Sequence, residues 1–237
     1  MYNNQLPQLF LLHYAGGNVY SFNFLKKYLE NSFEVICLEL PGRGKRMFEP
    51  ILKDKEKAIN DQFNEILKYR KTGVDFVVYG HSMGAIIGLG VTYLLEKSKD
   101  APRSLIVTGN SGPGNYREEQ FYKLEPLQFS TALKELGGIP NELFENIELF
   151  DFFEPVLRAD FEIVEREIDE DPILVNCPIY CVMGSDEKYV HRILNWKNIT
   201  NSEFKYEIFE GNHFFINNHP EKLAQFIKKA YYDTLVL

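Results

Sequence analysis

The chain has 237 residues, of which 45% are hydrophobic, and a formal net charge of −8. A chain of this length and composition can bury one sizeable core, so we expect a single globular domain over residues 1–237. The negative charge argues against a nucleic-acid partner, because phosphate binding needs a cationic patch.

The N-terminal segment lacks a cationic start, and its apolar run is far shorter than the roughly 18 residues that a membrane span requires. We therefore expect a cytoplasmic protein, monomeric and without membrane contact. The cysteines, Cys37, Cys177 and Cys181, are odd in number, lie in strand-like apolar runs and lack metal-ligand spacing. This pattern favours buried free thiols.

Short apolar runs alternate with longer segments of helical periodicity along most of the chain. The predicted strands are residues 9–13, 33–40, 75–80, 104–109, 178–184 and 204–210. Helical spacing is clear at 55–69 and 83–95, and a helix closes the chain after His219, with Pro220 suited to its first turn. The alternation predicts an α/β fold, a mostly parallel sheet with helices on both faces.

The alternation stops between about residues 115 and 172, where the apolar spacing is helical throughout. Gly137, Gly138 and Pro155 predict boundaries between several helices of this insertion. Acidic residues also concentrate there: residues 118–171 hold 16 acidic and 4 basic side chains, against 18 and 22 elsewhere. The insertion is therefore strongly acidic, and the remainder of the chain carries a small basic excess.

Residues 80–84 read Gly-His-Ser-Met-Gly, the spacing that hydrolases use for a nucleophilic serine. The motif follows a predicted strand and opens a predicted helix, as a nucleophile elbow does. A serine on such a tight turn has a strained backbone, so Gly80 and Gly84 must lack bulk. Ser82 is the candidate nucleophile, and the Met83 N–H, at the helix N-terminus, is a candidate oxyanion donor.

A nucleophilic serine needs a base and an orienting carboxylate, which in this kind of fold follow it in the order Asp or Glu, then His. His213 follows the sixth predicted strand and has the position of the base. Asp186 comes directly after the fifth strand and is the candidate carboxylate, with Glu187 as its near rival. The alternatives are a helix cap for Asp186 and a solvated loop position for His213.

A second oxyanion donor is expected from residues 13–22, the loop after the first strand, where Gly16 and Gly17 permit close approach of the backbone to a ligand. The N–H of Ala15 or of a neighbour is the candidate, and a plain glycine turn is the alternative. We interpret His13 as a packed strand-end residue. The sequence shows no nucleotide-binding glycine pattern and no zinc set of His and Cys, so we expect neither cofactor nor metal.

Seven segments of the chain together resemble the external type II thioesterases that accompany nonribosomal peptide and polyketide synthases. They read HYAGG, LPGRGKR, GHSMGA, LGGIPNELF, LRADFEIVE, GSDE and GNHFF, in the family's order and over nearly the whole chain. The resemblance implies an α/β-hydrolase fold, a helical lid formed by the insertion, and a triad of Ser82, His213 and Asp186. Tyr14 before Ala15 departs from the family's pattern, as does Glu187 after the aspartate.

The resemblance also implies the substrate, acyl groups carried as thioesters on the phosphopantetheine arm of acyl or peptidyl carrier proteins. In the family, their hydrolysis clears stalled or wrongly primed synthase modules. A small-molecule carboxylesterase on the same fold and a non-catalytic scaffold that binds a synthase are the alternatives.

The uneven charge distribution adds a hypothesis about how such a carrier docks. Carrier proteins are commonly acidic, so an acidic lid would repel them, whereas the basic remainder of the chain would not. Arg43, Lys45 and Arg46 are the first basic residues to test.

Overall fold

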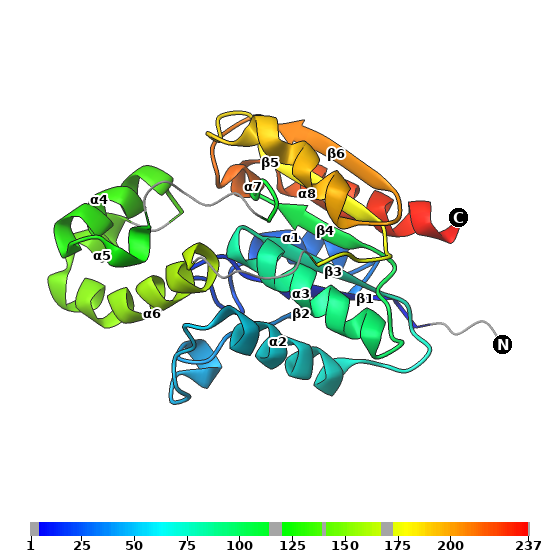
Figure 1. The fold of residues 1–237 in the computed structure, drawn as a ribbon, viewed down its shortest axis with the longest axis horizontal. Coiled ribbons are helices and arrows are strands. Elements are labelled where there is room, and N and C mark those ends of the chain that lie inside the picture. The colour runs from blue at the N-terminus through cyan, green and yellow to red at the C-terminus, as the bar shows by residue number, and fades with distance from the viewer. Residues whose placement is uncertain (1–4, 114–119, 139–140, 167–172, 237) are drawn as a thin grey trace.

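A six-stranded sheet forms the centre of the computed structural model, which describes residues 5–113, 120–138, 141–166 and 173–236 (Figure 1). The strands are β1 (Gln8–Leu12), β2 (Glu34–Cys37), β3 (Phe76–His81), β4 (Leu105–Thr108), β5 (Ile179–Gly184) and β6 (Phe204–Phe209). Their order is β2-β1-β3-β4-β5-β6, and every neighbouring pair is parallel. All six predicted strands are confirmed, with ends shifted by at most a few residues.

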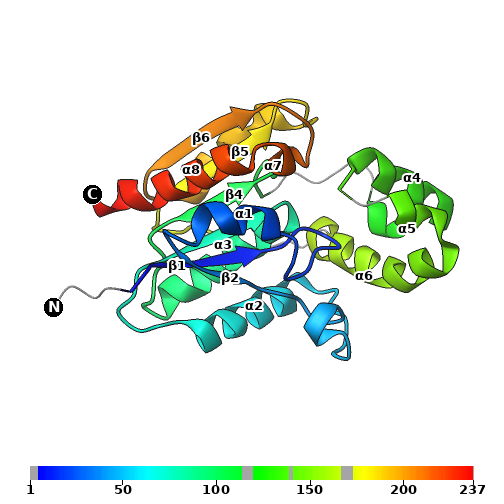
Figure 2. The same cartoon turned by 180° about the vertical axis from the view of Figure 1, so that it is seen from behind.

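Helices cover both faces of the sheet, as Figures 1 and 2 show from opposite sides. They are α1 (Asn23–Leu29), α2 (Lys55–Tyr69), α3 (Met83–Lys97), α7 (Phe215–Asn218) and α8 (Pro220–Tyr232). Short 3-10 segments lie at Gly44–Arg46, Val190–Ile199 and Asp233–Leu235. Helices α2 and α3 pack on one face, and α1 and α8 pack on the other.

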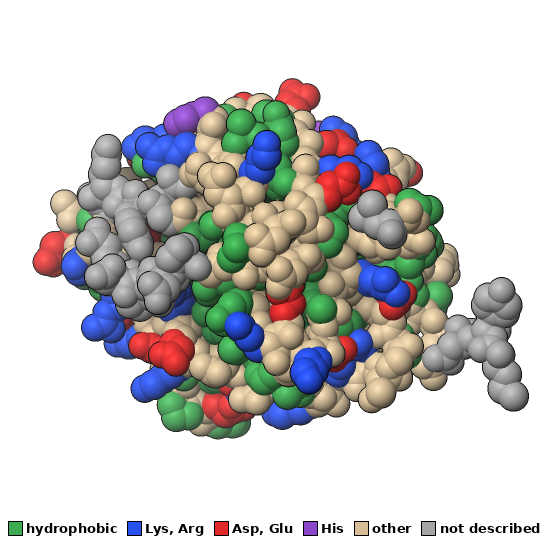
Figure 3. All heavy atoms as spheres, turned by 45° about the vertical axis from the view of Figure 1, so that its right-hand side comes forward, with side chains coloured by type: hydrophobic (Ala, Val, Ile, Leu, Met, Phe, Trp, Pro, Cys, Tyr) green, Lys and Arg blue, Asp and Glu red, His purple; other side chains and the backbone are tan. Residues whose placement is uncertain are grey.

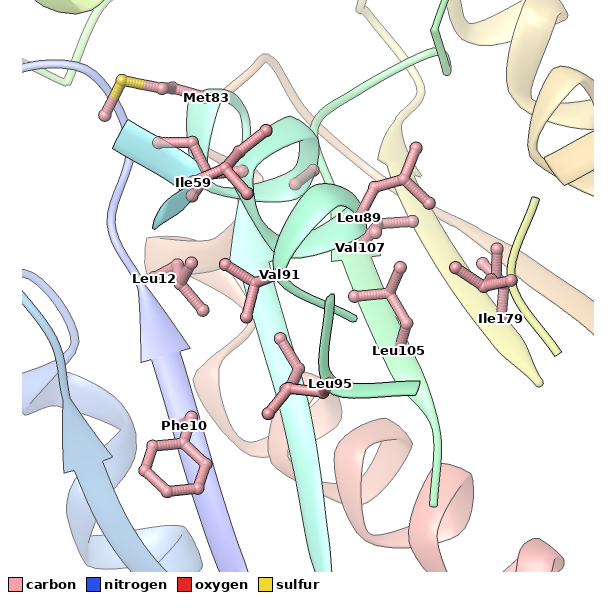
Figure 4. Close-up of a cluster of buried hydrophobic side chains, with 14 of the residues drawn as sticks. Phe10, Leu12, Ile59, Met83, Leu89, Val91, Leu95, Leu105, Val107 and Ile179 are labelled. Atoms are coloured by element: carbon pink, nitrogen blue, oxygen red, sulfur yellow. The ribbon is translucent and has the colours of Figure 1, made fainter. Parts of the chain in front are cut away.

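Alternate residues of each strand supply two separate apolar clusters. In β1, Phe10 and Leu12 belong to the cluster under α2 and α3, whereas Leu9 and Leu11 belong to the cluster under α1 and α8. This follows from the period of two along a strand, and burial on both faces explains why the four central strands, β1, β3, β4 and β5, are mostly apolar. Figure 4 shows part of the first cluster, with Phe10 and Leu12 of β1 and Val91 and Leu95 of α3 among its side chains.

The insertion between β4 and β5, called the lid below, lies beyond one end of the sheet (Figures 1 and 2). It contains a short 3-10 turn (Phe121–Lys123) and helices α4 (Pro126–Leu136), α5 (Asn141–Glu145) and α6 (Ile147–Glu165). Gly137 ends α4 with φ of 82°, as predicted. The rest of the chain is called the body.

Pro155 does not separate two helices, so that prediction is wrong. It lies inside α6, where it removes one backbone hydrogen bond. Burial of Val156 and Leu157 just beyond it stabilises the continuous helix. None of the helices in the described ranges is both long enough and apolar enough to cross a membrane.

Candidate active site

Ser82 stands at the turn between β3 and α3 with a strained backbone. Its φ is 56° and its ψ is −113°, a region that a non-glycine residue occupies only where the surroundings enforce it. A Cβ on Gly80 would lie 2.0 Å from the Gly84 carbonyl oxygen, and one on Gly84 would lie 2.2 Å from that of Leu12. Both glycines are therefore sterically required, and the predicted nucleophile elbow is present.

His213 lies in the turn between β6 and α7 and reaches the serine. Its Nε2 is 2.9 Å from Ser82 Oγ, a hydrogen-bond distance at which the imidazole can accept the hydroxyl proton. The side chain is 11% exposed, so the contact is largely shielded from water. The structure thus brings together the predicted nucleophile and base from positions 131 residues apart.

The carboxylate on His213 belongs to Glu187, and the prediction of Asp186 for this position is wrong. Glu187 Oε2 lies 2.8 Å from His213 Nδ1, and Glu187 Oε1 accepts the Gly184 N–H at 2.8 Å. Both oxygens of the carboxylate are therefore occupied. An acceptor-only carboxylate on Nδ1 places the imidazole proton there and leaves Nε2 free to accept from Ser82.

The turn after β5 explains why the neighbouring residue is not the partner. The Glu187 N–H donates to the Gly184 carbonyl at 3.2 Å, which folds the chain back. Asp186 is exposed at the tip and accepts the Ser185 hydroxyl at 2.7 Å. This fold of the chain could not be foreseen from the spacing alone. It brings the Glu187 carboxylate back to Gly184 at the end of β5, where it also meets His213.

Another histidine, His81, is fully buried and lies against His213. Its ring is 5.1 Å from that of His213 and 5.6 Å from that of Tyr14, and its Nδ1 is 2.9 Å from the Thr108 hydroxyl. Burial, followed by the nearby charge of His213, lowers the pKa of His81 well below its usual value. His81 is therefore neutral, and it packs the back of the site without adding charge beside His213.

The loop of residues 13–22 packs against His81, the residue before Ser82. Tyr14 stacks edge-on against His81 and Phe214, with ring centroids 5.6 and 5.0 Å away. His13 is buried, with Nδ1 2.8 Å from the Tyr14 carbonyl and Nε2 accepting the Leu40 N–H. Burial, then the charge of Arg43, lowers the pKa of His13 to about 4, so its packed role is confirmed.

The two predicted oxyanion donors lie on different elements, Met83 at the start of α3 and Ala15 in the loop after β1. Met83 opens α3, and the first amides of a helix have no partner within it. Ala15 is half-buried and packs against the apolar cluster of the lid.

The three cysteines are free thiols, as predicted. Cys177 and Cys181 are buried, Cys37 is half-buried, and burial raises the pKa of each thiol. Within the described ranges, no three His, Cys, Asp or Glu side chains form a group that could hold a metal ion.

A serine, a histidine and a carboxylate at the ends of parallel strands define a serine hydrolase of the α/β-hydrolase fold. The model of the thioesterase domain family matches residues 7–231. The chain therefore belongs to this family of thioester hydrolases, and the resemblance noted in the sequence is confirmed.

Individual relatives cover most of the chain. The protein named linear gramicidin dehydrogenase LgrE, from Brevibacillus parabrevis, is 29% identical over 96% of this chain and 89% of its own. The rat medium-chain S-acyl fatty acid synthase thioesterase is 29% identical over 88% of this chain and 81% of its own.

A solved structure gives the same answer for the fold. The RedJ thioesterase from the prodiginine pathway of Streptomyces coelicolor superposes with a TM-score of 0.86 at 27% identity. The match covers 96% of this chain and 86% of that one. LgrE's name denotes a different chemistry, but the present sequence lacks the Gly-x-Gly-x-x-Gly fingerprint of dinucleotide binding.

Proposed function

We propose that this protein hydrolyses acyl thioesters carried on the phosphopantetheine arm of carrier proteins in a nonribosomal peptide or polyketide synthase system. The single observation that carries the chemistry is the 2.9 Å contact of Ser82 Oγ with His213 Nε2 at a strained elbow. The family match and relatives with biosynthetic names support the substrate class. The proposed reaction needs neither cofactor nor metal.

The first half-reaction forms an acyl-enzyme. His213 Nε2 takes the hydroxyl proton as Ser82 Oγ bonds to the thioester carbonyl carbon, and the carbonyl oxygen becomes an oxyanion. The N–H groups of Met83 and Ala15 stabilise this oxyanion. When it collapses, the carbon–sulfur bond breaks, and the pantetheine thiol leaves with the proton from His213.

The second half-reaction returns the enzyme to its starting state. His213 takes a proton from water, the hydroxide attacks the acyl ester on Ser82, and the carboxylic acid leaves as Ser82 regains its proton. In both halves Glu187 fixes the imidazole tautomer and stabilises the imidazolium while it is charged. The carrier thiol is already free after the first half-reaction, and the second frees Ser82, so the two together remove an acyl group from a carrier as an editing enzyme must.

The lid supplies an apolar surround for the acyl group. A Cβ on Gly138 would lie 2.1 Å from the ring of Phe214, so the lid backbone after α4 lies directly on the residue that follows His213. The lid cluster also reaches Ala15. The exclusion of water that this contact provides strengthens the electrostatic interactions within the site.

The structure corrects the hypothesis about carrier docking at three basic residues. Arg43 is buried against Asp160, and Arg46 is bound by Asp61 and Glu49. Lys45 is the exposed one of the three. On the face drawn in Figure 3, basic side chains lie singly or in small groups, with acidic side chains near several of them.

A panel of acyl-loaded carrier proteins tests the proposed function. We expect release by the wild type to exceed release by Ser82→Ala about 10⁴-fold or more, because loss of the nucleophile removes the covalent route. The matched oxygen ester of each acyl group serves as the control for substrate class. Faster turnover of the oxygen ester than of the carrier thioester would favour the carboxylesterase, and no turnover by the wild type would favour a scaffold.

A further inference from the structure

A buried carboxylate of the lid binds the loop of residues 13–22. Asp160, on α6, is fully buried, and its Oδ2 accepts the Gly16 N–H at 2.8 Å. Arg43, from the segment after β2, donates to both oxygens of this carboxylate, at 2.5 and 2.7 Å. Arg43 Nη1 also lies 3.4 Å from the Gly17 carbonyl oxygen. The lid and the body therefore hold two peptide groups of the loop, the one between Ala15 and Gly16 and the one that follows Gly17.

Apolar packing by the same lid helix accompanies this contact. Gly16 has φ of 77°, and a Cβ there would lie 2.6 Å from Leu157 Cδ2 on the same lid helix. Ala15, one residue earlier, packs against the lid cluster. Helix α6 thus fixes both the position and the orientation of the peptide between Ala15 and Gly16.

This arrangement also assigns the backbone donors of the loop. The Gly16 N–H points to Asp160 and is not available to an oxyanion. The preceding amide, on Ala15, is the candidate donor. It belongs to the neighbouring peptide, between Tyr14 and Ala15, whose carbonyl accepts the Gly17 N–H at 2.9 Å, so the turn that Asp160 holds at Gly16 also restrains that peptide. A displacement of about 1 Å in such a group can cost a hundredfold in rate.

The stability of the fold alone does not account for the ion pair. Apolar residues of similar volume often replace a buried ion pair at no cost in folding stability, because burial removes both charges from water. Here the Asp160 carboxylate has a second role, because it pairs with Arg43 and also accepts the Gly16 N–H.

We propose that Asp160 is a positioning residue for the oxyanion loop, by which the lid helix sets the Ala15 N–H against the reacting carbonyl. The proposal rests on the proposed function, because it concerns the same serine and its oxyanion. It adds that the lid takes part in the chemical step through a hydrogen bond, in addition to covering the acyl group.

Two charge-free double variants isolate the hydrogen bond from the ion pair. Arg43→Met with Asp160→Asn removes both charges and keeps an acceptor for Gly16, whereas Arg43→Met with Asp160→Leu removes the acceptor as well. With an acyl-pantetheine thioester as substrate, we expect kcat of the Leu form to be at least tenfold below that of the Asn form, with KM within threefold.

An oxyanion-specific readout separates positioning from a general structural effect. An alkyl boronic acid, which forms a tetrahedral anionic adduct with the serine, should lose affinity in the Leu form by about the same factor as kcat. A matched control is the Arg46 to Asp61 pair of the body, with contacts of 2.7 and 2.8 Å. The corresponding Met/Asn and Met/Leu variants of that pair should have equal kcat.

Equal kcat and equal boronic acid affinity in the Asn and Leu forms would overturn the proposal about Asp160. The proposed function would still stand in that case, provided that the wild type hydrolyses the thioester. If the Leu form does not fold, Asp160→Ala in the same background takes its place. A measurement on the wild type needs no variant: the Gly16 amide proton should exchange as slowly as the buried part of α6, and rapid exchange would overturn the proposal. Absence of wild-type turnover would instead contradict the proposed function.

Discussion

The body and the lid differ in the size of their apolar cores. The body has two large apolar clusters, one on each face of the sheet. The lid cluster has four buried members, Phe129, Leu133, Leu157 and Phe161. On the lid surface, Leu127 remains 80% exposed and Ile147 75%.

The difference shows how the two regions divide the work. The three candidate catalytic side chains, Ser82, Glu187 and His213, follow strands β3, β5 and β6 of the body, and the last residue of each of these strands is buried. The lid has a small core of its own, and its last helix is fixed by side chains such as Ile163, which joins a body cluster. The body therefore supplies reactive groups, and the lid depends on the body for its position.

The largest expected effect distinguishes two adjacent acidic residues of the body. Glu187→Gln should lower kcat about 10³- to 10⁴-fold, because an amide on Nδ1 favours the wrong imidazole tautomer and cannot stabilise the imidazolium. Asp186→Asn, one residue away and exposed, should change kcat less than twofold. Steady-state kinetics on a thioester measure both, and a larger loss in Asp186→Asn would contradict the assignment of Glu187.

The next effect compares a buried with an exposed residue of the same lid helix. Phe129→Ala should reduce the free energy of unfolding by about 3–5 kcal/mol, because it leaves a cavity in the lid cluster. Leu127→Ala, on the exposed side of α4, should change it by less than about 0.5 kcal/mol. Urea unfolding followed by far-UV circular dichroism measures both, and similar values for the two variants would refute the existence of a packed lid core.

A smaller effect belongs to the body alone, because all five histidines lie outside the lid. Burial lowers the pKa of His13 from 6.5 to about 4, so between these pH values the unfolded chain binds a proton that the folded chain does not. The contribution of His13 to the free energy of unfolding is therefore fully present above pH 6.5. It falls by up to about 1.4 kcal/mol per pH unit as the pH drops from 6.5 to 4.

Removing the group tests that slope. His13→Asn should unfold more readily at neutral pH, since the contacts with Tyr14 and Leu40 are weakened, but its stability should depend less steeply on pH between 6.5 and 4. Urea midpoints over this range give the slope for both proteins. An identical slope would show that His13 titrates normally in the folded state.

The elements of the body could be predicted from the sequence because their signals are local. Helix α2 has the predicted bounds, Lys55–Tyr69, and α3 begins at the predicted Met83. The elbow could also be predicted, because only glycine fits at positions 80 and 84 of this short turn. The positions of Ser82 and His213 then followed from strand order.

Features that depend on tertiary contacts could not be read in the same way. Asp186 and Glu187 are both acidic and adjacent, and the turn that selects Glu187 is set by its bonds to Gly184 and His213. Pro155 has the local signature of a helix boundary. The helix continues through it because Val156 and Leu157 are buried by tertiary contacts, which the local sequence does not reveal. The position of Asp160 could have been noticed in the sequence, because a charged residue among the apolar positions of a helix indicates a buried polar contact.

The central claim is that Ser82 forms an acyl-enzyme with a group delivered by a carrier protein. Intact-protein mass spectrometry after rapid mixing with an acyl-loaded carrier tests it most directly. Wild type, and more strongly the slowed Glu187→Gln form, should gain the mass of the acyl group, which proteolysis should locate on the peptide that holds Ser82, and Ser82→Ala should gain none. Acid release by the wild type with no adduct at any time, or an adduct of equal amount in Ser82→Ala, would contradict the account.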